Sequence, residues 1–234
     1  MPTLKNSYSL SIVKKTDDTN VNEWVYQVLR RSIMCGEIRP GIALTIRGLA
    51  EKLDVSPMPV REALHKLASQ AAVEVRDNRR VMVPLISPDK FKELCELRII
   101  LETHAAKTAL SYITASDLAE LKHLDSLVDD AYSEGNLMKG SLANQAFHRY
   151  FYSRNPIQVC LPMIESLWLQ LGPFVRIALQ KLEDYYVNDR HQEALQAIEQ
   201  NNSHALAEAI GNDIRDGISL IKDVDQTYQY LRDQ

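Results

Sequence analysis

The stretch that decides the fold runs Val55-Ser56-Pro57-Met58-Pro59-Val60-Arg61-Glu62-Ala63-Leu64-His65-Lys66-Leu67. Its composition is typical of a short helix that presents its N-terminal end. Ser56 is expected to cap this helix, because a serine hydroxyl can accept a hydrogen bond from a free backbone N–H of the first turn. Pro57 and Pro59 fall within that first turn, where no N–H needs an intrahelical partner.

The two faces of this helix differ in character. A buried stripe at helical spacing is predicted for Val60, Leu64 and Leu67. Another face carries Met58, Arg61 and His65. A helix with a rigid and cationic N-terminal end, preceded by another short helix, indicates the recognition helix of a helix-turn-helix.

The flanking sequence completes a small domain over residues 21–84. Apolar periodicity predicts a helix from Val21 that stops at Gly36, and a second helix that Thr45 caps. A short extended piece at 42–44 separates them, and Asp54-Val55 forms the turn before the decisive helix. Alternating valines at 73, 75, 81 and 83 predict a half-buried hairpin. Three helices and a hairpin indicate a winged helix-turn-helix, preceded by a flexible arm at residues 1–20.

The remainder of the chain, residues 88–231, has helical periodicity throughout and no alternating strands. After a linker at 84–88, helices are expected at 88–111, 115–134, 138–154, 156–181, 188–200 and 202–231. Their breaks fall at Gly135-Asn136, Asn155-Pro156 and Asn201-Asn202. We therefore expect a mainly α protein whose C-terminal domain is an all-α antiparallel bundle of about six helices.

Charge is distributed unevenly over the 234 residues. The net charge is −4, but residues 21–86 carry +3 and residues 87–234 carry −8. The basic segment 21–86 is followed by an acidic segment, 87–234. This asymmetry suggests that the N-terminal part of the chain binds a polyanion. The three widely spaced cysteines are interpreted as reduced thiols of a cytoplasmic protein. No signal peptide is recognised, and the apolar region 157–179 is too interrupted by proline and charge to span a bilayer.

Several motifs in the expected order resemble a known family. Pro59-Val60-Arg61-Glu62-Ala63-Leu64, together with Glu37-Ile38-Arg39-Pro40-Gly41, resembles the DNA-binding domain of the GntR family of bacterial transcription regulators. Leu97-Arg98-Ile99-Ile100-Leu101-Glu102 resembles the start of the effector domain, called FCD, of the FadR branch. Asn144-Gln145-Ala146-Phe147-His148, followed by Asn155-Pro156, is similar to another FCD signature. The resemblance covers residues 21 to about 222.

This resemblance implies a homodimer that binds a double-stranded DNA operator through the recognition helix and the wing. The implied DNA contacts are Arg47, Ser56, Met58, Arg61, Asn78 and Arg79. Arg61 is the best candidate for reading a base, because a guanidinium can donate two hydrogen bonds to guanine. The alternative for Arg61 is a surface ion pair with Glu62 or Glu51. Family members have Arg and Thr where this chain has Pro57 and Met58, so the operator should differ from those of relatives.

The resemblance also implies a metal site in the helical domain, where the family uses one Asp and three His. The corresponding positions are Asn144, His148, His191 and Asp213, with Asn212 as the neighbouring choice for the last. A spacing of four places Asn144 and His148 on one helix face, as chelation needs. One divalent ion, Zn, Ni, Mn or Fe, is compatible with this set. The alternatives are that both histidines serve the helix packing, or that the site was abandoned.

Arg98 lies where the family has an arginine that faces the effector pocket. A guanidinium clamps a carboxylate at two points, so a small organic acid is the expected effector. The alternative is that Arg98 pairs with Glu102, four residues along the same helix. The sequence favours a non-enzymatic, ligand-responsive regulator and leaves two other classes of protein open. They are a metal-dependent enzyme with a helical fold and a winged-helix adaptor that binds protein.

Overall fold

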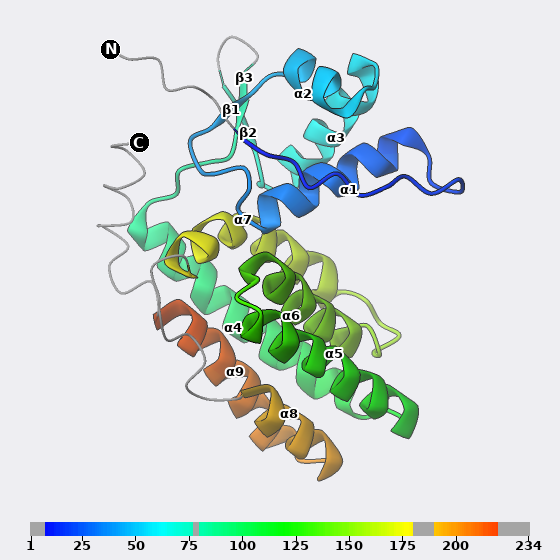
Figure 1. Ribbon diagram of the computed structural model, residues 1–234. Coiled ribbons are helices and arrows are strands. Elements are labelled where there is room, and N and C mark those ends of the chain that lie inside the picture. Colours follow the sequence, from blue (N-terminus) through cyan, green and yellow to red (C-terminus); the bar gives the residue numbers. More distant parts are fainter. Residues whose placement is uncertain (1–7, 77–79, 180–189, 220–234) are drawn as a thin grey trace. The chain divides into compact units, whose positions relative to one another are not determined.

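The computed structural model describes residues 8–76, 80–179 and 190–219 (Figure 1). The chain divides into two compact units. The N-terminal unit contains the described residues up to Pro88, together with residues 168–177. The helical unit contains residues 89–167 and the described residues beyond 177.

The N-terminal unit has the elements expected of a winged helix-turn-helix. They are α1 (Val21–Met34), β1 (Ala43–Leu44), α2 (Ile46–Leu53), α3 (Pro57–Ser69), β2 (Glu74–Arg76) and β3 (Arg80–Met82). Side chains cap two of the helices as the sequence suggests, since Asn20 accepts from the backbone of Glu23 and Thr45 accepts from Gly48. The extended piece at 43–44 joins the hairpin, and the sheet has three strands in the order β1-β3-β2.

The core of this unit lies between α1 and α3. Val28, Leu29 and Ile33 of α1 are fully buried, as are Val60 and Leu67 of α3. The predicted stripe on the recognition helix is therefore confirmed.

One valine of the hairpin differs from the expected pattern. Val75 is 61% exposed, whereas Val73, Val81 and Val83 are buried. Val75 lies opposite Val81 in the register, but β2 is an outer strand of the sheet and has a neighbouring strand on one side only. Alternation alone does not distinguish an edge strand from a central one.

In two turns of this unit, a residue other than glycine has a left-handed backbone conformation. Asp54 ends α2 with a φ of 51°, and Ala71, just before the hairpin, has a φ of 54°. Aspartate tolerates this conformation and was expected there. Alanine in this conformation costs roughly 1–2 kcal/mol, because its Cβ approaches the following carbonyl oxygen. This strain lies at Ala71, in the turn that connects α3 to the wing.

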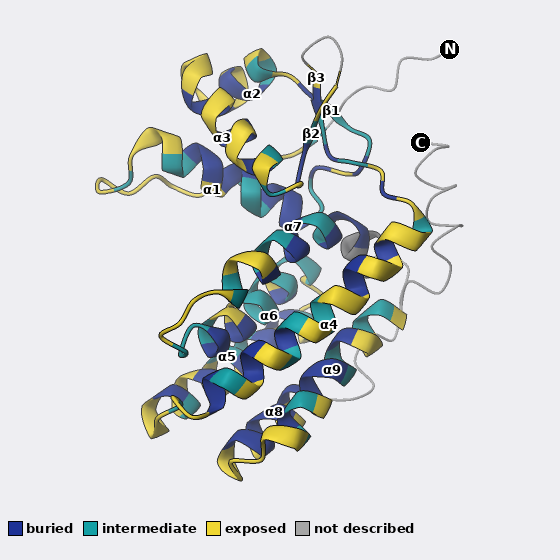
Figure 2. Cartoon of the chain, turned by 180° about the vertical axis from the view of Figure 1, so that it is seen from behind, coloured by how far each residue is buried: buried dark blue, intermediate teal, exposed yellow. Residues whose placement is uncertain are grey.

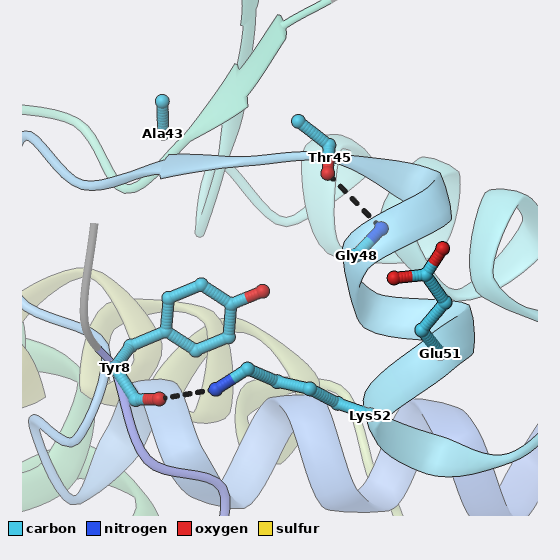
Figure 3. A pocket seen from close by; sticks show the side chains of 6 residues that line it. All are labelled: Tyr8, Ala43, Thr45, Gly48, Glu51 and Lys52. Atoms are coloured by element: carbon cyan, nitrogen blue, oxygen red, sulfur yellow. Dashed lines mark hydrogen bonds between the residues drawn. The ribbon is translucent and has the colours of Figure 1, made fainter. Parts of the chain in front are cut away.

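The segment before α1 is tied to this unit by several contacts. Lys52 of α2 donates to the carbonyl oxygen of Tyr8 at 2.7 Å, with its ammonium 4.3 Å from the ring centre. Both groups line a shallow pocket of about 430 Å³ beside the start of α2 (Figure 3). Further along, the indole of Trp24 donates to the carbonyl of Val13. The flexibility expected for residues 1–20 stays a prediction.

The helical unit confirms an all-α fold in the described residues. Its helices are α4 (Pro88–Leu110), α5 (Ala115–Ser133), α6 (Leu137–Tyr152), α8 (Arg190–Glu199) and α9 (Ser203–Ser219), together with the first part of α7 (Cys160–Leu179), whose residues 168–177 belong to the N-terminal unit. The closest neighbours are α5 with α6 and α8 with α9. The expected breaks at Gly135 and Asn201 are present, and both residues have positive φ.

Helix α7 begins at Cys160 and not at residue 156 as expected. The side chain of Asn155 accepts a hydrogen bond from the backbone of Ile157, which forms a local turn that competes with the helix.

No described helix is both long enough and apolar enough to cross a membrane. The three cysteines are free, as expected, and Cys35 and Cys95 are buried.

A capping network joins the start of α5 to the end of α6. Asp117 accepts from the backbone and hydroxyl of Thr114, while Thr114 accepts in return from the backbone of Asp117. The same carboxylate accepts from the hydroxyl of Tyr150 at 2.8 Å and from Arg154 at 3.2 Å. The hydrogen bonds from Thr114, Tyr150 and Arg154 hold the pKa of Asp117 well below its usual range. This network fixes α6, the helix that carries Asn144 and His148, against α5.

Asp117→Asn should lower the free energy of unfolding by about 1 kcal/mol at neutral pH, because a neutral amide replaces a carboxylate that accepts charge-assisted hydrogen bonds. Because the folded state depresses this pKa, the stabilisation is present above the unfolded pKa of about 4 and is lost as the pH falls further. Urea unfolding between neutral and acidic pH would measure this. Asp130→Asn, an exposed carboxylate on the same helix, is the control. A deficit of equal size at acidic pH would contradict the expectation.

Candidate functional site

The N-terminal end of α3 is open to solvent. Ser56, Met58 and Arg61 are exposed, and Met58 reaches 57% exposure. Figure 2 shows exposed residues along one side of α3. The hairpin of the wing adjoins this helix in sequence, but Asn78 and Arg79 lie outside the described residues. The surface that the resemblance assigns to DNA is thus accessible wherever it is described.

Ser56 occupies the N-cap position of α3, but its side chain makes no cap hydrogen bond. Ser56 is thus the N-cap residue as expected, but the expected hydrogen bond to its hydroxyl is absent, and Pro59 removes one of the two N–H groups that could form it. An N-cap side chain accepts from the second or third N–H of the helix. The third position here is Pro59, which has no N–H. The hydroxyl of Ser56 is therefore not committed to the helix and can bind another group.

The carboxylates that could pair with Arg61 have other partners. Glu62 accepts from the side chain of Asn22, and Glu51 pairs with Arg47 at 2.8 Å. Within the described part of the chain, Arg61 has no ion pair. Its guanidinium is free to donate to a ligand. Arg47 is 91% exposed, so its pair with Glu51 is weak and can exchange for a phosphate.

In the helical unit, three of the four expected ligand residues converge. One potential ligand atom from each of His148, His191 and Asp213 lies within 4.8 Å of the other two. These residues come from α6, α8 and α9. The two Nε2 atoms are 3.3 Å apart, and Nε2 of His148 is 3.3 Å from a carboxylate oxygen of Asp213. Both histidines are buried, with at most 1% exposure.

Asn144, the fourth expected residue, lies beside them. Its side-chain nitrogen is 3.3 Å from Nε2 of His191. Half a turn of the amide would present its oxygen at the same place. The ring of Phe147 stacks on His191, with centres 4.2 Å apart and planes inclined by 14°, and holds that imidazole in place.

In each imidazole, Nδ1 makes a hydrogen bond that orients the ring and therefore its Nε2 atom. Nδ1 of His191 lies 2.7 Å from Asp125, a carboxylate that can only accept, so Nδ1 carries a proton. Nδ1 of His148 lies 3.2 Å from the hydroxyl of Tyr152, which itself donates to Glu102 at 3.0 Å. Burial, together with Glu102, raises the pKa of Tyr152 well above its usual value, so the hydroxyl keeps its proton.

These bonds direct the lone pairs of both Nε2 atoms toward each other and toward Asp213. Three acceptors that face one point repel each other unless a cation or a proton lies between them. Where a proton on Nε2 of His148 occupies that point, its hydrogen bond to Asp213 and the positive groups nearby lower the pKa of Asp213 to about 2, although burial would raise it. The residue is therefore a carboxylate at neutral pH.

The distances fit a single metal ion. Two nitrogens bound to one tetrahedral ion at about 2.0–2.1 Å lie about 3.3–3.4 Å from each other. The separation of the two Nε2 atoms, 3.3 Å, falls at this value. Two imidazoles and a carboxylate are ordinary ligands of Zn, Ni, Mn and Fe. The residues present therefore fit a divalent ion, with Asp125 and Tyr152 as the groups that orient the ligands.

Arg98 lies in the same unit, and its Nε donates to Glu102 four residues along α4. This pair was the alternative that the sequence left open. The Glu102 side chain is fully buried, and the Arg98 side chain is 17% exposed. The bond uses one of the five N–H donors of the guanidinium. Glu102 also accepts from Tyr152, so Arg98 is connected to His148 through two side chains.

The sequence did not point to Asp125, Glu102 or Tyr152 as parts of this centre. A signal existed for Asp125, which interrupts the buried stripe of Leu121 and Val128 on α5. A carboxylate in an apolar stripe needs a partner, because burying an unpaired charge is costly.

Both halves of the chain match family models. Residues 22–83 match the model described as bacterial regulatory proteins, gntR family, and residues 93–216 match the FCD domain. The chain is 33% identical over 145 residues to the HTH-type transcriptional regulator McbR of Escherichia coli K12, covering 62% of this chain and 66% of McbR. It is 34% identical over 102 residues to the transcriptional repressor RspR of the same organism, covering 44% and 45%. The alignments thus span about half to two thirds of these relatives.

Solved structures share the fold. The structure of E. coli McbR/YncC aligns with a TM-score of 0.77 and 24% identity, covering 91% of this chain and 99% of that one. A GntR regulator from Rhodococcus sp. RHA1, described as putative, aligns with a TM-score of 0.70 and 23% identity, covering 87% and 99%. The two matched domains, in this order and over most of the described residues, show that the chain belongs to the GntR family of bacterial regulatory proteins and carries an FCD domain.

Proposed function

We propose that this protein is a transcriptional regulator that binds operator DNA as a homodimer and responds to a small effector in its helical domain. The observation that carries the proposal is the combination of two different sites in one chain. An exposed, cationic helix end in a winged domain suits DNA, whereas a buried polar centre in a separate helical domain suits a small ligand. The relatives are named as transcriptional regulators, one of them as a repressor.

The DNA-binding part of the proposal rests on α3. Its exposed end carries Arg61 without an ion pair in the described structure, and the hydroxyl of Ser56 is available beside it. Arg61 would donate to the edge of a guanine, and Arg47 would contact phosphate. Met58 presents an apolar side chain that can pack on a thymine methyl group. The wing residues Asn78 and Arg79 would add contacts in the neighbouring groove.

The sensing part of the proposal rests on the convergence of His148, His191 and Asp213, with Asn144 beside them. These residues would hold one divalent ion. A bound ion would supply a Lewis-acidic position for an oxygen atom of the effector. Arg98 would pair with a carboxylate of that effector, which makes a small organic acid the favoured class. The effector controls DNA binding only if it binds unequally to the DNA-competent and DNA-incompetent arrangements.

A protein-binding adaptor is the rival use of a winged domain, and salt dependence separates the two. Operator DNA contacts release counterions, so affinity falls steeply as salt rises. An adaptor would show no such loss because it would not bind the duplex.

Arg61→Ala should weaken operator binding by about 1–3 kcal/mol, or roughly 5- to 150-fold, because a bidentate base contact is lost. The loss should be largest for the operator and small for unrelated DNA. Arg47→Ala should instead weaken all sequences alike and reduce the dependence on salt. Fluorescence anisotropy at several salt concentrations measures both effects, with Lys122→Ala in the helical unit as the control. Unchanged operator affinity in Arg61→Ala would rule out α3 as the reading helix.

Protein purified without a histidine tag should contain about one divalent ion per chain, measured by mass spectrometry of the metals. His148→Gln should lose the ion because it removes a ligand. Asp125→Asn should bind it about 10- to 100-fold more weakly, because the orientation of His191 is no longer fixed. His123→Gln changes an exposed histidine of α5 and should retain the ion. Metal content below about a tenth of an equivalent in the unaltered protein, before and after incubation with Zn or Ni, would argue against the site.

A panel of small mono- and dicarboxylic acids should include one that raises the melting temperature and changes operator binding. An acid present at 100 times its dissociation constant stabilises the folded state by about 2.7 kcal/mol. Arg98→Lys should lose most of this response, because an ammonium group cannot donate two parallel hydrogen bonds to a carboxylate. Arg149→Lys, an exposed arginine of α6, should keep it. An equal response in Arg98→Lys would exclude Arg98 as the effector contact.

A further inference from the structure

Helix α7 belongs to both compact units of the chain. Its residues up to Leu167 are part of the helical unit, and its residues 168–177 are part of the N-terminal unit. Ile164 on one side of this boundary is fully buried, and so is Leu169 on the other. Because the helix continues across the boundary, a displacement of its first turn is passed along its backbone into the N-terminal unit.

The first turn of α7 borders a pocket next to the polar centre. The pocket has a volume of about 290 Å³, and Tyr152, Cys160 and Leu161 are among the residues that line it. The hydroxyl of Tyr152 lies 3.2 Å from Nδ1 of His148. Because protein interiors are otherwise close-packed, this open space gives the first turn of α7 room for a second position. A change in the orientation of His148 can therefore reach α7 through Tyr152.

The second part of α7 touches the end of α1 with its backbone. A Cβ atom added to Gly172 would lie 2.4 Å from the carbonyl oxygen of Met34, the last residue of α1, and 2.9 Å from the Cα of Met34. Glycine permits such a close approach because it has no side chain. The contact leaves no space between the two helices, so a movement of α7 toward α1 must displace α1.

A proline makes α7 easiest to bend at this contact. Pro173 lies inside the helix and has no N–H to donate to the carbonyl oxygen of Leu169, four residues earlier. Helices bend where such a hydrogen bond is missing. The segment 160–168 can thus tilt as one rigid piece. A tilt of this segment changes the position of Gly172 against Met34 and so shifts the end of α1.

Helix α1 in turn holds the recognition helix. The side chains of Glu23 and Lys66 pair at 3.3 Å, and the hydroxyl of Tyr26 donates to Gln70 at 3.0 Å. The ammonium of Lys66 also lies 3.7 Å from the centre of the Tyr26 ring. These polar contacts flank the apolar core that α1 and α3 share, so a shift of α1 moves α3 with it.

We propose that α7 couples the polar centre of the helical unit to the recognition helix, and that Gly172 is the positioning residue of this coupling. The inference rests on the proposed function, because it needs a ligand at the centre and DNA at α3, and it adds the route between them. A bound cation would fix the orientation of His148, shift Tyr152 and the first turn of α7, and change the contact of Gly172 with α1. Such coupling is reciprocal, so DNA would change the affinity for the cation by the same factor.

Gly172→Ala tests the contact, with Zn²⁺ as the only ligand added to protein that a chelator has freed of metal. In the unaltered protein, saturating Zn²⁺ should change operator affinity by at least about 5-fold, the lower end of usual allosteric coupling. In Gly172→Ala the added methyl group forces α7 away from the carbonyl of Met34. The factor should then fall below about 2-fold, while Zn²⁺ binding is retained. Fluorescence anisotropy measures operator affinity, and calorimetry measures Zn²⁺ binding.

The ratio of the two operator affinities separates coupling from simple destabilisation. A variant that only loosens the N-terminal unit would lose operator affinity equally with and without Zn²⁺, so its ratio would not change. Met163→Ala alters an exposed side chain of the same helix and should keep the full ratio.

Trp168 tests the movement of α7 without any change at Gly172. Its side chain is buried and lies just after the boundary between the units. In a Trp24→Phe background it is the only tryptophan of the chain, so its emission reports on α7 alone. Zn²⁺ has a filled d shell and no redox chemistry, and it should shift this emission by moving α7. An emission spectrum that bound Zn²⁺ leaves unchanged would overturn the coupling through α7.

The outcomes separate this inference from the function on which it rests. An equal effect of Zn²⁺ on operator affinity in the unaltered protein and in Gly172→Ala would overturn the role of Gly172 and leave the regulator standing. A protein that binds Zn²⁺ with no effect on operator affinity would overturn the coupling but not the metal site. A protein that binds no Zn²⁺ would overturn both. DNA binding itself is tested by Arg61→Ala, whose result does not depend on α7.

Discussion

The hydrogen bond between His191 and Asp125 is the interaction on which the polar centre of the helical domain depends. It joins α5 to α8 at 2.7 Å, with both side chains almost completely buried. A free imidazole can carry its proton on either nitrogen, but this contact requires the proton on Nδ1 and leaves Nε2 as an acceptor. Without this hydrogen bond, nothing would keep the lone pair on Nε2 of His191, the atom that faces His148 and Asp213. The arrangement that suits this centre to a cation is thus set by Asp125, a residue that would not touch the ion.

The two domains meet different electrostatic demands. The exposed end of α3 lies in water, where the unpaired guanidinium of Arg61 is well solvated and can exchange solvent for a ligand. The centre of the helical domain excludes water, so each carboxylate there needs a hydrogen-bond donor or a positive neighbour. Glu102 has both, from Tyr152 and Arg98. This arrangement joins Arg98, the proposed effector contact, to His148, a proposed metal ligand, through the side chains of Glu102 and Tyr152.

Local features were predictable from the sequence because their causes are local. The cap at Thr45, the left-handed turn at Asp54 and the breaks between helices follow from the conformational preferences of single residues. The grouping of His148, His191 and Asp213 came from a family resemblance, not from spacing, because three separate helices supply them. The edge position of Val75 and the partner Asp125 depend on tertiary contacts. The missing hydrogen bond at Ser56 depends in part on Pro59, which has no N–H to donate. Sequence periodicity contains none of this information.

The two prolines at the start of α3 have a further thermodynamic consequence. Each fixes its own φ near the helical value, so the first turn of the recognition helix has few conformations to lose. Many DNA-binding segments become ordered only on the duplex, and part of their interaction energy is offset by that ordering. Here the reading end is already rigid when DNA arrives. Binding should therefore proceed with a small change in heat capacity and little entropic penalty from the protein backbone, in the manner of a preformed surface.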